Sequence, residues 1–313
     1  MRKRKYKKLK LQKSYTLRPT NPGAERWLGV VIPVLNHGYV YLLDYLGGDG
    51  DIEQAARVSY GEGTRKVSQT GGLIRYLASH SHTSPFEMVE FKFHAKMPIF
   101  VARQWVRHRT ASLNEYSARY SVLKNEFYVP KSSAISVQSL DNKQGRGNSV
   151  NSTIAKKIKD RLSKHYKASN GFYQWLLDEN DGPGLARELA RITLPLAVYT
   201  QWYWKIDLHN LLHFLKLRMD KHAQLEIREY ANAIATIVKD AVPFTWEAFN
   251  DYKLEALSLN RLEKDVLKKT FSGKEVALDE NEINAVAAQV GLNNKRELME
   301  FKDKLRDMGL IKT

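Results

Sequence analysis

Residues Glu90–Met97, which read EFKFHAKM, alternate strictly between polar and apolar side chains. In an extended chain the apolar ones share one face, which comprises Phe91, Phe93, Ala95 and Met97. This pattern predicts a half-buried strand. Pro98 follows directly, and because proline is favoured in the first turn of a helix, we expect a helix over residues 99–108.

Further strands and helices are predicted on both sides of this segment. Residues 38–45 (GYVYLLDY) and 196–206 (LAVYTQWYWKI) are rich in aromatic and β-branched residues, which is typical of strands. Residues 131–149 are rich in Ser, Asn, Gln and Gly and predict a long loop. Apolar residues at helical spacing predict helices in 51–60 (capped by Asp51), 71–80, 154–166, 185–192, the segment capped by Asp207, and 223–238. Because regular βαβ units are lacking, we expect an α+β fold.

Cysteine is missing from the whole chain of 313 residues. This excludes disulfides, thiolate-bound zinc, cysteine-held iron–sulfur clusters and a cysteine nucleophile. No apolar run reaches the ~18 residues of a membrane span, and no apolar segment follows the basic N-terminus as in a secretory signal. We therefore expect a cytoplasmic protein.

Positive charge is concentrated at the N-terminus. The net charge is +16, and residues 1–13 hold eight Lys and Arg and no acid, which leaves +8 on the remainder. A solvated tail and a segment that attracts nucleic acid both fit this pattern. We expect a basic tail and linker in residues 1–22, disordered in part, a catalytic domain in 23–252, and a helical extension in 253–313.

The densest polar stretch is Arg103–Arg119, RQWVRHRTASLNEYSAR. It holds four arginines, and converging arginines form bidentate phosphate sites. The Arg107–Arg109 triplet falls at or past the predicted helix end, where its side chains can diverge. Glu115, Ser117 and Arg119 alternate, so an extended segment would point them the same way. A surface helix end with salt bridges is the alternative, and composition alone indicates an anion site and no more.

Two histidine-containing segments are weaker candidates. His209 and His213 share a helix face at metal-ligand spacing, but position 210 is Asn and not the Glu of a zinc-hydrolase helix. We therefore expect hydrogen-bonded histidines and no metal. Residues 80–87 (HSHTSPFE) predict first a turn and only second a catalytic loop.

These motifs together resemble the flavin-dependent thymidylate synthases. The Arg107–Arg109 triplet, followed after seven residues by Ser117, matches the family signature RHR-x7-S. Residues 82–87 (HTSPFE) resemble the family segment H-x-[ST]-P-F-E. The remaining blocks, in the family's order, are 186–195 (ARELARITLP), 214–218 (FLKLR), 222–224 (HAQ) and 243–249 (PFTWEAF).

The resemblance implies a fold, a set of ligands and a set of site residues. The fold would be an antiparallel-rich mixed sheet with long helices, in a homotetramer with active sites where subunits meet. The ligands would be FAD, dUMP, methylenetetrahydrofolate and NADPH. The positions that would bind dUMP are Gln104, Trp105, Val106, Arg107, Glu115, Tyr116, Ser117, Ala118, Arg119, Arg191 and Arg218. The positions that would bind FAD are Ser84, Arg107, His108, Arg109, Glu115, Asp207, Leu208, His209 and His213. The catalytic residues would be Arg218, against the uracil ring, and His82, near the flavin and folate.

One departure from the family pattern concerns FAD. Asp207, Leu208 and His209 stand where many members have Asn-x-Arg, so the hydrogen bonds to FAD are expected to differ. The family chemistry otherwise agrees with the composition, because classical thymidylate synthases attack the uracil ring with a cysteine. In a chain without cysteine another route is needed. A reduced flavin can supply the hydride, and Arg218 can polarise the ring. A nucleic-acid-binding protein and a flavoprotein that methylates uracil in another substrate remain alternatives.

Overall fold

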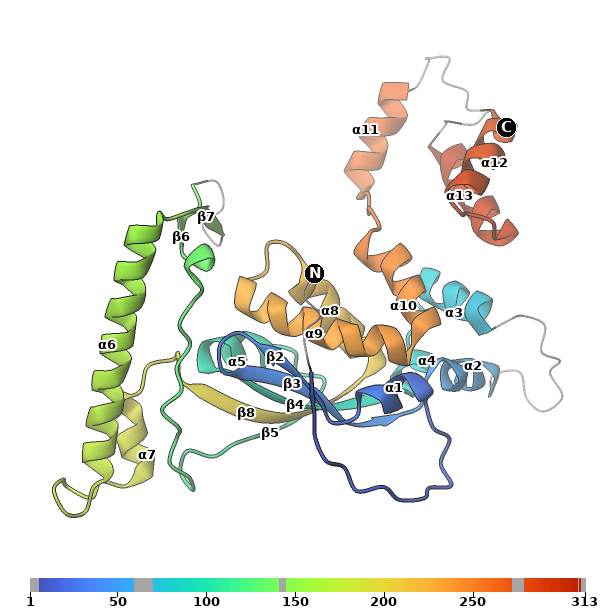
Figure 1. Cartoon of the computed structure of the whole chain (residues 1–313). Coiled ribbons are helices and arrows are strands. Elements are labelled where there is room, and N and C mark those ends of the chain that lie inside the picture. Colours follow the sequence, from blue (N-terminus) through green and yellow to red (C-terminus); the bar gives the residue numbers. More distant parts are fainter. Residues whose placement is uncertain (1–5, 59–69, 141–144, 272–278, 309, 311–313) are drawn as a thin grey trace. The chain divides into compact units, whose positions relative to one another are not determined.

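The computed structural model describes residues 6–58, 70–140, 145–271, 279–308 and 310. The chain divides into two compact units, Met1–Glu255 and Ala256–Thr313. The second unit contains the helices α11 (Arg261–Phe271), α12 (Glu280–Gln289) and α13 (Lys295–Asp307). The first unit contains the motifs described above (Figure 1).

A six-stranded sheet organises the first unit. Its strands, in spatial order, are β1 (Lys7–Lys8), β2 (Val30–Val34), β3 (Gly38–Leu46), β4 (Glu90–Pro98), β8 (Tyr199–Asp207) and β5 (Ser112–Glu115). Neighbouring strands in this order are antiparallel throughout the described residues, where an antiparallel-rich mixed sheet was expected. The α+β expectation is confirmed. The sequence did not predict β1, β2 or β5. In β1, part of the basic tail pairs with Val30 and Val31.

Strand β4 lies near the centre of the sheet and carries the alternation seen in the sequence. The four apolar residues of its buried face are each 0% exposed, which confirms the strand and its register: Phe91, Phe93, Ala95 and Met97. Pro98 closes the strand and caps the following helix, so the proline is the residue before the helix and not its first residue. The observed helix also ends earlier than predicted, at Trp105.

Helices cover one face of the sheet and extend from its edges (Figure 1). They are α1 (Pro22–Trp27), α2 (Asp49–Arg57), α3 (Thr70–Ser79), α4 (Ser84–Glu87), α5 (Ile99–Trp105), α6 (Ser152–Leu177), α7 (Arg187–Ala190), α8 (Leu208–Met219), α9 (Leu225–Ala241) and α10 (Pro243–Phe249). The inward positions predicted for α9 are all 0% exposed: Ile227, Tyr230, Ile234 and Ile237. These side chains and the buried face of β4 belong to one apolar core, which also includes Trp105 of α5 and Leu211 and Phe214 of α8.

Two local predictions need correction. Helix α2 begins at Asp49 with Gly48 as its cap, and Asp51 lies inside the first turn, where its carboxylate accepts from the Gly48 N–H at 2.8 Å. The predicted end of that helix, Tyr60, lies outside the described residues. The expected loop 131–149 contains a small hairpin of β6 (Ser136–Gln138) and β7 (Arg146–Ser149).

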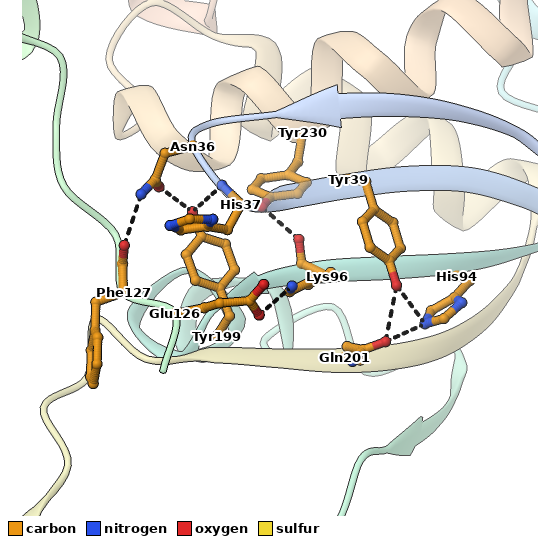
Figure 2. A network of polar contacts seen from close by, with 10 residues as sticks. All are labelled: Asn36, His37, Tyr39, His94, Lys96, Glu126, Phe127, Tyr199, Gln201 and Tyr230. Carbon is orange, nitrogen blue, oxygen red and sulfur yellow. Dashed lines mark hydrogen bonds and ion pairs between the residues drawn. The ribbon is translucent and has the colours of Figure 1, made fainter. Parts of the chain in front are cut away.

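The polar face of the sheet carries a network of hydrogen bonds (Figure 2). The hydroxyl of Tyr39 donates to Gln201 Oε1 at 2.9 Å, and His94 contacts both residues. Lys96 Nζ lies 2.5 Å from Glu126 Oε2, and the lysine side chain is only 10% exposed. This pair joins the centre of the sheet to the chain that follows the Arg-rich motif. Among the described residues, no helix is both long and apolar enough to cross a membrane.

Candidate active site

The end of α5 and the face of α8 enclose a pocket of about 390 Å³, here called the Arg218 pocket. Because the helix stops at Trp105, the next residues leave its axis and spread around the pocket wall. The lining residues named in the sequence are Arg107, His108, Arg109, His213 and Arg218. Asn210 also lines this pocket and was missed, although it stands one residue after His209 on the predicted helix. The structure therefore brings together the triplet and Arg218, which are far apart in the sequence.

Arg218 is held by two contacts on the α5 side of the pocket. Its Nε donates to His108 Nε2 at 3.0 Å, and its Nη2 donates to the Gln104 carbonyl oxygen at 3.3 Å. A guanidinium can only donate, so His108 Nε2 must be the acceptor and Nδ1 carries the proton of the neutral ring. Burial, followed by the charge of Arg107, lowers the pKa of Arg218.

The neutral state of His108 is reinforced by its surroundings. Burial, Arg218 and His213, in that order, lower the pKa of His108 from 6.5 to about 4. The imidazole is thus an uncharged acceptor at neutral pH, and the positive charge of the pair resides on Arg218.

We expect the His108 ring to titrate near pH 4 in the folded protein. In the unfolded chain His108 binds a proton below about pH 6.5, whereas in the folded chain it does so only near pH 4. Between these two values the unfolded state binds more protons, so His108 lowers the free energy of unfolding as the pH falls from 6.5 to 4. Carbon-13 NMR of labelled histidine measures the midpoint, and His108→Gln assigns the signal. A His108 midpoint at or above 6.5 would contradict this arrangement.

A second pocket of about 280 Å³ adjoins the first, since His213 lines both; we call it the His82 pocket. His82 and His209 reach it from the α3–α4 turn and from α8. Most of the remaining wall is apolar, from Leu77, Phe86, Leu212 and Phe249. Thr83, Lys216 and Lys253 also line it and were missed; the spacing of three residues between His213 and Lys216 is the signal that could have identified that lysine.

A third pocket of about 340 Å³ lies at the end of β5 and is called the Ser117 pocket. The predicted dUMP residues that line it are Glu115, Tyr116, Ser117, Ala118 and Arg191. Thr200, which is 4% exposed, also lines it and donates from its hydroxyl to Glu115 Oε1 at 2.6 Å. Buried Thr200 thus orients a carboxylate that is otherwise exposed.

The segment after Glu115 does not continue as a strand, contrary to the expected alternation. Strand β5 ends at Glu115. Ser117 then begins a turn, in which its carbonyl oxygen accepts a hydrogen bond from the Tyr120 N–H at 3.3 Å. Arg119 turns toward Glu188, with 3.1 Å between Nη2 and Oε2. Within one chain, Arg119 therefore neutralises a carboxylate and lines none of the three pockets.

Several predicted site residues have side chains directed elsewhere. Trp105 is 0% exposed and stacks on Phe214, with ring centroids 5.1 Å apart, so its indole belongs to the core. Leu208 is also 0% exposed. Asp207 accepts from the Asn210 backbone N–H and side-chain amide, at 2.9 and 2.8 Å, and caps α8 as predicted. These three residues support the site rather than face a ligand.

The remaining predicted residues line none of the three pockets. Gln104 bonds to Gln224 through their side-chain amides. Val106 is exposed just after α5, and Ser84 is exposed at the start of α4. No described residue lines both the Ser117 pocket and either of the other two, so the predicted dUMP residues of one chain are divided between separate pockets.

The fold and the pockets define a class of protein: an antiparallel α+β unit whose arginine-lined pockets suit phosphate-bearing ligands. Residues 41–244 match the family described as "Thymidylate synthase complementing protein". A flavin-dependent thymidylate synthase of Ruegeria pomeroyi is 48% identical over 288 residues, which cover 92% of each chain. Another, of Rickettsia prowazekii, is 51% identical over 279 residues, which cover 86% of this chain and 95% of the relative. The chain belongs to the flavin-dependent thymidylate synthase family.

Solved structures support the same assignment. A UMP/dUMP methylase, PolB from Streptomyces cacaoi bound with 5-Br dUMP, is similar with a TM-score of 0.64 and 32% identity over 71% of this chain and 99% of that one. The same methylase bound with 5-Br UMP gives a TM-score of 0.63 and 34% identity, over 71% of this chain and 98% of that one. The family resemblance found in the sequence is confirmed, and the enzyme is favoured over the nucleic-acid-binding alternative.

Proposed function

We propose that the three pockets are parts of composite active sites, completed by further copies of the chain in a homotetramer. The observation that carries this proposal is the division of the predicted nucleotide residues between pockets that share no wall. Exposed apolar side chains near the Ser117 pocket offer surface for a partner subunit. They are Phe172, Trp175, Leu189, Ile192 and Leu196.

The reaction is that of the family, in which dUMP is methylated at carbon 5 to form dTMP. FAD is the cofactor, and methylenetetrahydrofolate and NADPH are co-substrates. FAD supplies, when bound and reduced, the hydride that completes the methyl group. A cysteine-free chain cannot form the covalent adduct of classical thymidylate synthases, so its own residues must activate the uracil ring without a thiolate.

The residues of the two adjoining pockets fit FAD chemically. Arg107, Arg109 and Asn210 present donors that suit a pyrophosphate. The His82 pocket combines apolar walls with His82 and His209, which suits a flat aromatic ring with polar edges. We therefore assign FAD to these pockets, with His213 at their junction.

Arg218 is assigned to the uracil ring. Its guanidinium stands at the pocket wall, oriented by His108 and by the Gln104 carbonyl. A fixed cation beside a uracil favours negative charge on the ring and so raises the reactivity of carbon 5. Ser117, Arg119 and Arg191 are assigned to the phosphate and sugar of dUMP, with Arg119 exchanging Glu188 for the nucleotide. Arg107 is shared between dUMP and FAD, as in the sequence prediction.

The purified protein is expected to be yellow, with flavin absorbance that NADPH bleaches under anaerobic conditions. With methylenetetrahydrofolate added, it should release tritium from dUMP labelled at carbon 5. Labelled UMP and uracil-containing RNA serve as competing substrates, and tritium release from RNA in preference to dUMP would favour the alternative flavoprotein. A protein that binds no added FAD would overturn the proposal. The cytoplasmic location and the assignment of residues 23–252 as the catalytic domain stay predictions from the sequence.

A further inference from the structure

Glu226, near the start of α9, is an almost completely buried carboxylate outside the three pockets, with 1% exposure. Arg146 of β7 donates from Nη2 to both carboxylate oxygens at 2.6 Å. The Tyr128 hydroxyl donates to Oε1 at 2.7 Å, and Gln224 Nε2 donates to Oε2 at 2.9 Å. Three segments distant in the sequence therefore meet at one anion.

The carboxylate is ionised in the folded protein. Burial by itself would raise the pKa of Glu226, but the hydrogen bonds from Arg146, Tyr128 and Gln224 outweigh it and hold the pKa below its usual range. An ionised carboxylate has acceptors only. Its neighbours must therefore turn donors toward it.

The ionised carboxylate sets the orientation of two side-chain amides, first Gln224 and then Gln104. Gln224 presents its NH₂ group to Glu226, so its oxygen faces the other way, and Gln104 donates to that oxygen through Nε2. Gln104 in turn commits one of its two N–H groups to this bond, which leaves its side-chain oxygen, together with the second N–H, at the free end of the chain. Among the described residues this oxygen has no hydrogen-bond partner.

The backbone of Gln104 contacts the residue assigned to the uracil ring. The backbone carbonyl of Gln104 accepts from Arg218 Nη2 at 3.3 Å, and its side chain is partly exposed. Without Glu226, a glutamine here could rotate its amide by 180° and offer a donor as readily as an acceptor. With Glu226, one N–H of Gln104 is held by Gln224, so the amide cannot rotate by 180° and its oxygen keeps one fixed direction.

We propose that Glu226 is a positioning residue that, through Gln224, fixes Gln104 with its carboxamide oxygen toward the substrate. Gln104 then recognises a hydrogen-bond donor of the nucleotide, the ring N3–H or a sugar hydroxyl, and not a phosphate oxygen. This inference rests on the proposed function and on the placement of Gln104 among the dUMP-binding positions that the family resemblance implies.

The test measures nucleotide affinity by calorimetry on the FAD-loaded protein. Gln104→Ala, Gln224→Met and Glu226→Gln are each expected to weaken dUMP binding about tenfold, the scale of one hydrogen bond. Glu226→Gln in a Gln104→Ala background should add no further loss. Glu229→Gln, which removes the same charge from α9, is the matched control and should leave the affinity unchanged. Gln224→Met keeps the ionised carboxylate with Arg146 and Tyr128, so it reports on the chain of amides even where Glu226→Gln fails to fold.

Two analogues identify the donor. Either 3-methyl-dUMP, which lacks N3–H, or 2′,3′-dideoxyuridine monophosphate, which lacks the 3′-hydroxyl, should bind the unaltered protein about tenfold more weakly than dUMP. The same analogue should show no such deficit in the Gln104→Ala, Gln224→Met and Glu226→Gln variants. A merely structural role for Glu226 would lower all affinities alike and would not erase this discrimination.

The remaining outcomes distinguish the positioning role of Glu226 from the placement of Gln104 in the dUMP site. If Gln104→Ala leaves dUMP affinity unchanged, the placement of Gln104 in the site is wrong, although flavin binding and tritium release still report on the enzyme. If Gln104→Ala weakens binding but Gln224→Met and Glu226→Gln do not, the positioning role of Glu226 is wrong. An additive loss in the double variant would overturn it as well.

Discussion

Arg218→Ala is expected to lower the rate of dUMP methylation about 10²- to 10³-fold, the usual cost of removing one preorganised electrostatic contact from a transition state. Arg218 Nε lies 3.0 Å from His108 Nε2, and its Nη2 lies 3.3 Å from the Gln104 carbonyl oxygen. These two contacts set the orientation of the guanidinium before a substrate binds. The variant should retain flavin, because the other lining residues of the Arg218 pocket remain. Single-turnover tritium release measures the rate, and flavin absorbance measures retention of the cofactor.

Two comparisons make the Arg218 result specific. Arg261→Ala removes an equal charge from α11, where Arg261 pairs with Asp265, and should leave the rate unchanged. Loss of Arg218 should also raise the pKa of His108, because the guanidinium is one of the causes that lower it. If Arg218→Ala keeps full turnover while the pKa of His108 rises, the contact between Arg218 and His108 is confirmed. The role of Arg218 in activating the uracil ring is then wrong.

Lys96→Met is expected to destabilise the protein by about 2–3 kcal/mol, because it leaves the Glu126 carboxylate half-buried without its partner. Lys96 Nζ and Glu126 Oε2 are 2.5 Å apart, with side-chain exposures of 10% and 28%. The ammonium also lies over the Tyr199 ring, 5.7 Å from its centroid (Figure 2). The midpoint of thermal unfolding, at fixed flavin concentration, measures the loss.

The neighbouring strand supplies a matched control for Lys96→Met. Lys205 of β8 pairs with Glu90 at 2.9 Å, but these side chains are 45% and 35% exposed, so Lys205→Met should cost less than about 1 kcal/mol. Combining Lys96→Met with Glu126→Leu should recover most of the loss, since no unpaired charge then remains. Equal midpoints for Lys96→Met and Lys205→Met would show that burial of the pair has no energetic effect.

Much of the fold could be predicted from local patterns. The alternation in β4, the i, i+3 and i+4 spacing in α9 and the cap at Asp207 each depend on residues close in the chain. Such patterns follow from the periods of 2.0 and 3.6 residues that strands and helices impose. The burial of the Trp105 indole could not be predicted this way, because Phe214 and Trp204 contact it from distant elements.

The sequence by itself determined the three long strands of the sheet, most of the helices, the family and the absence of cysteine chemistry. Only the tertiary structure decided which named residues face a pocket: it buried Trp105 and Leu208, brought Arg218 to His108, and divided the dUMP residues between two pockets. It also joined Glu226, through Gln224, to Gln104, residues more than 100 positions apart. The physical reason is that periodicity and capping act over a few residues, whereas burial, pKa and hydrogen-bond polarity are set by contacts between distant segments.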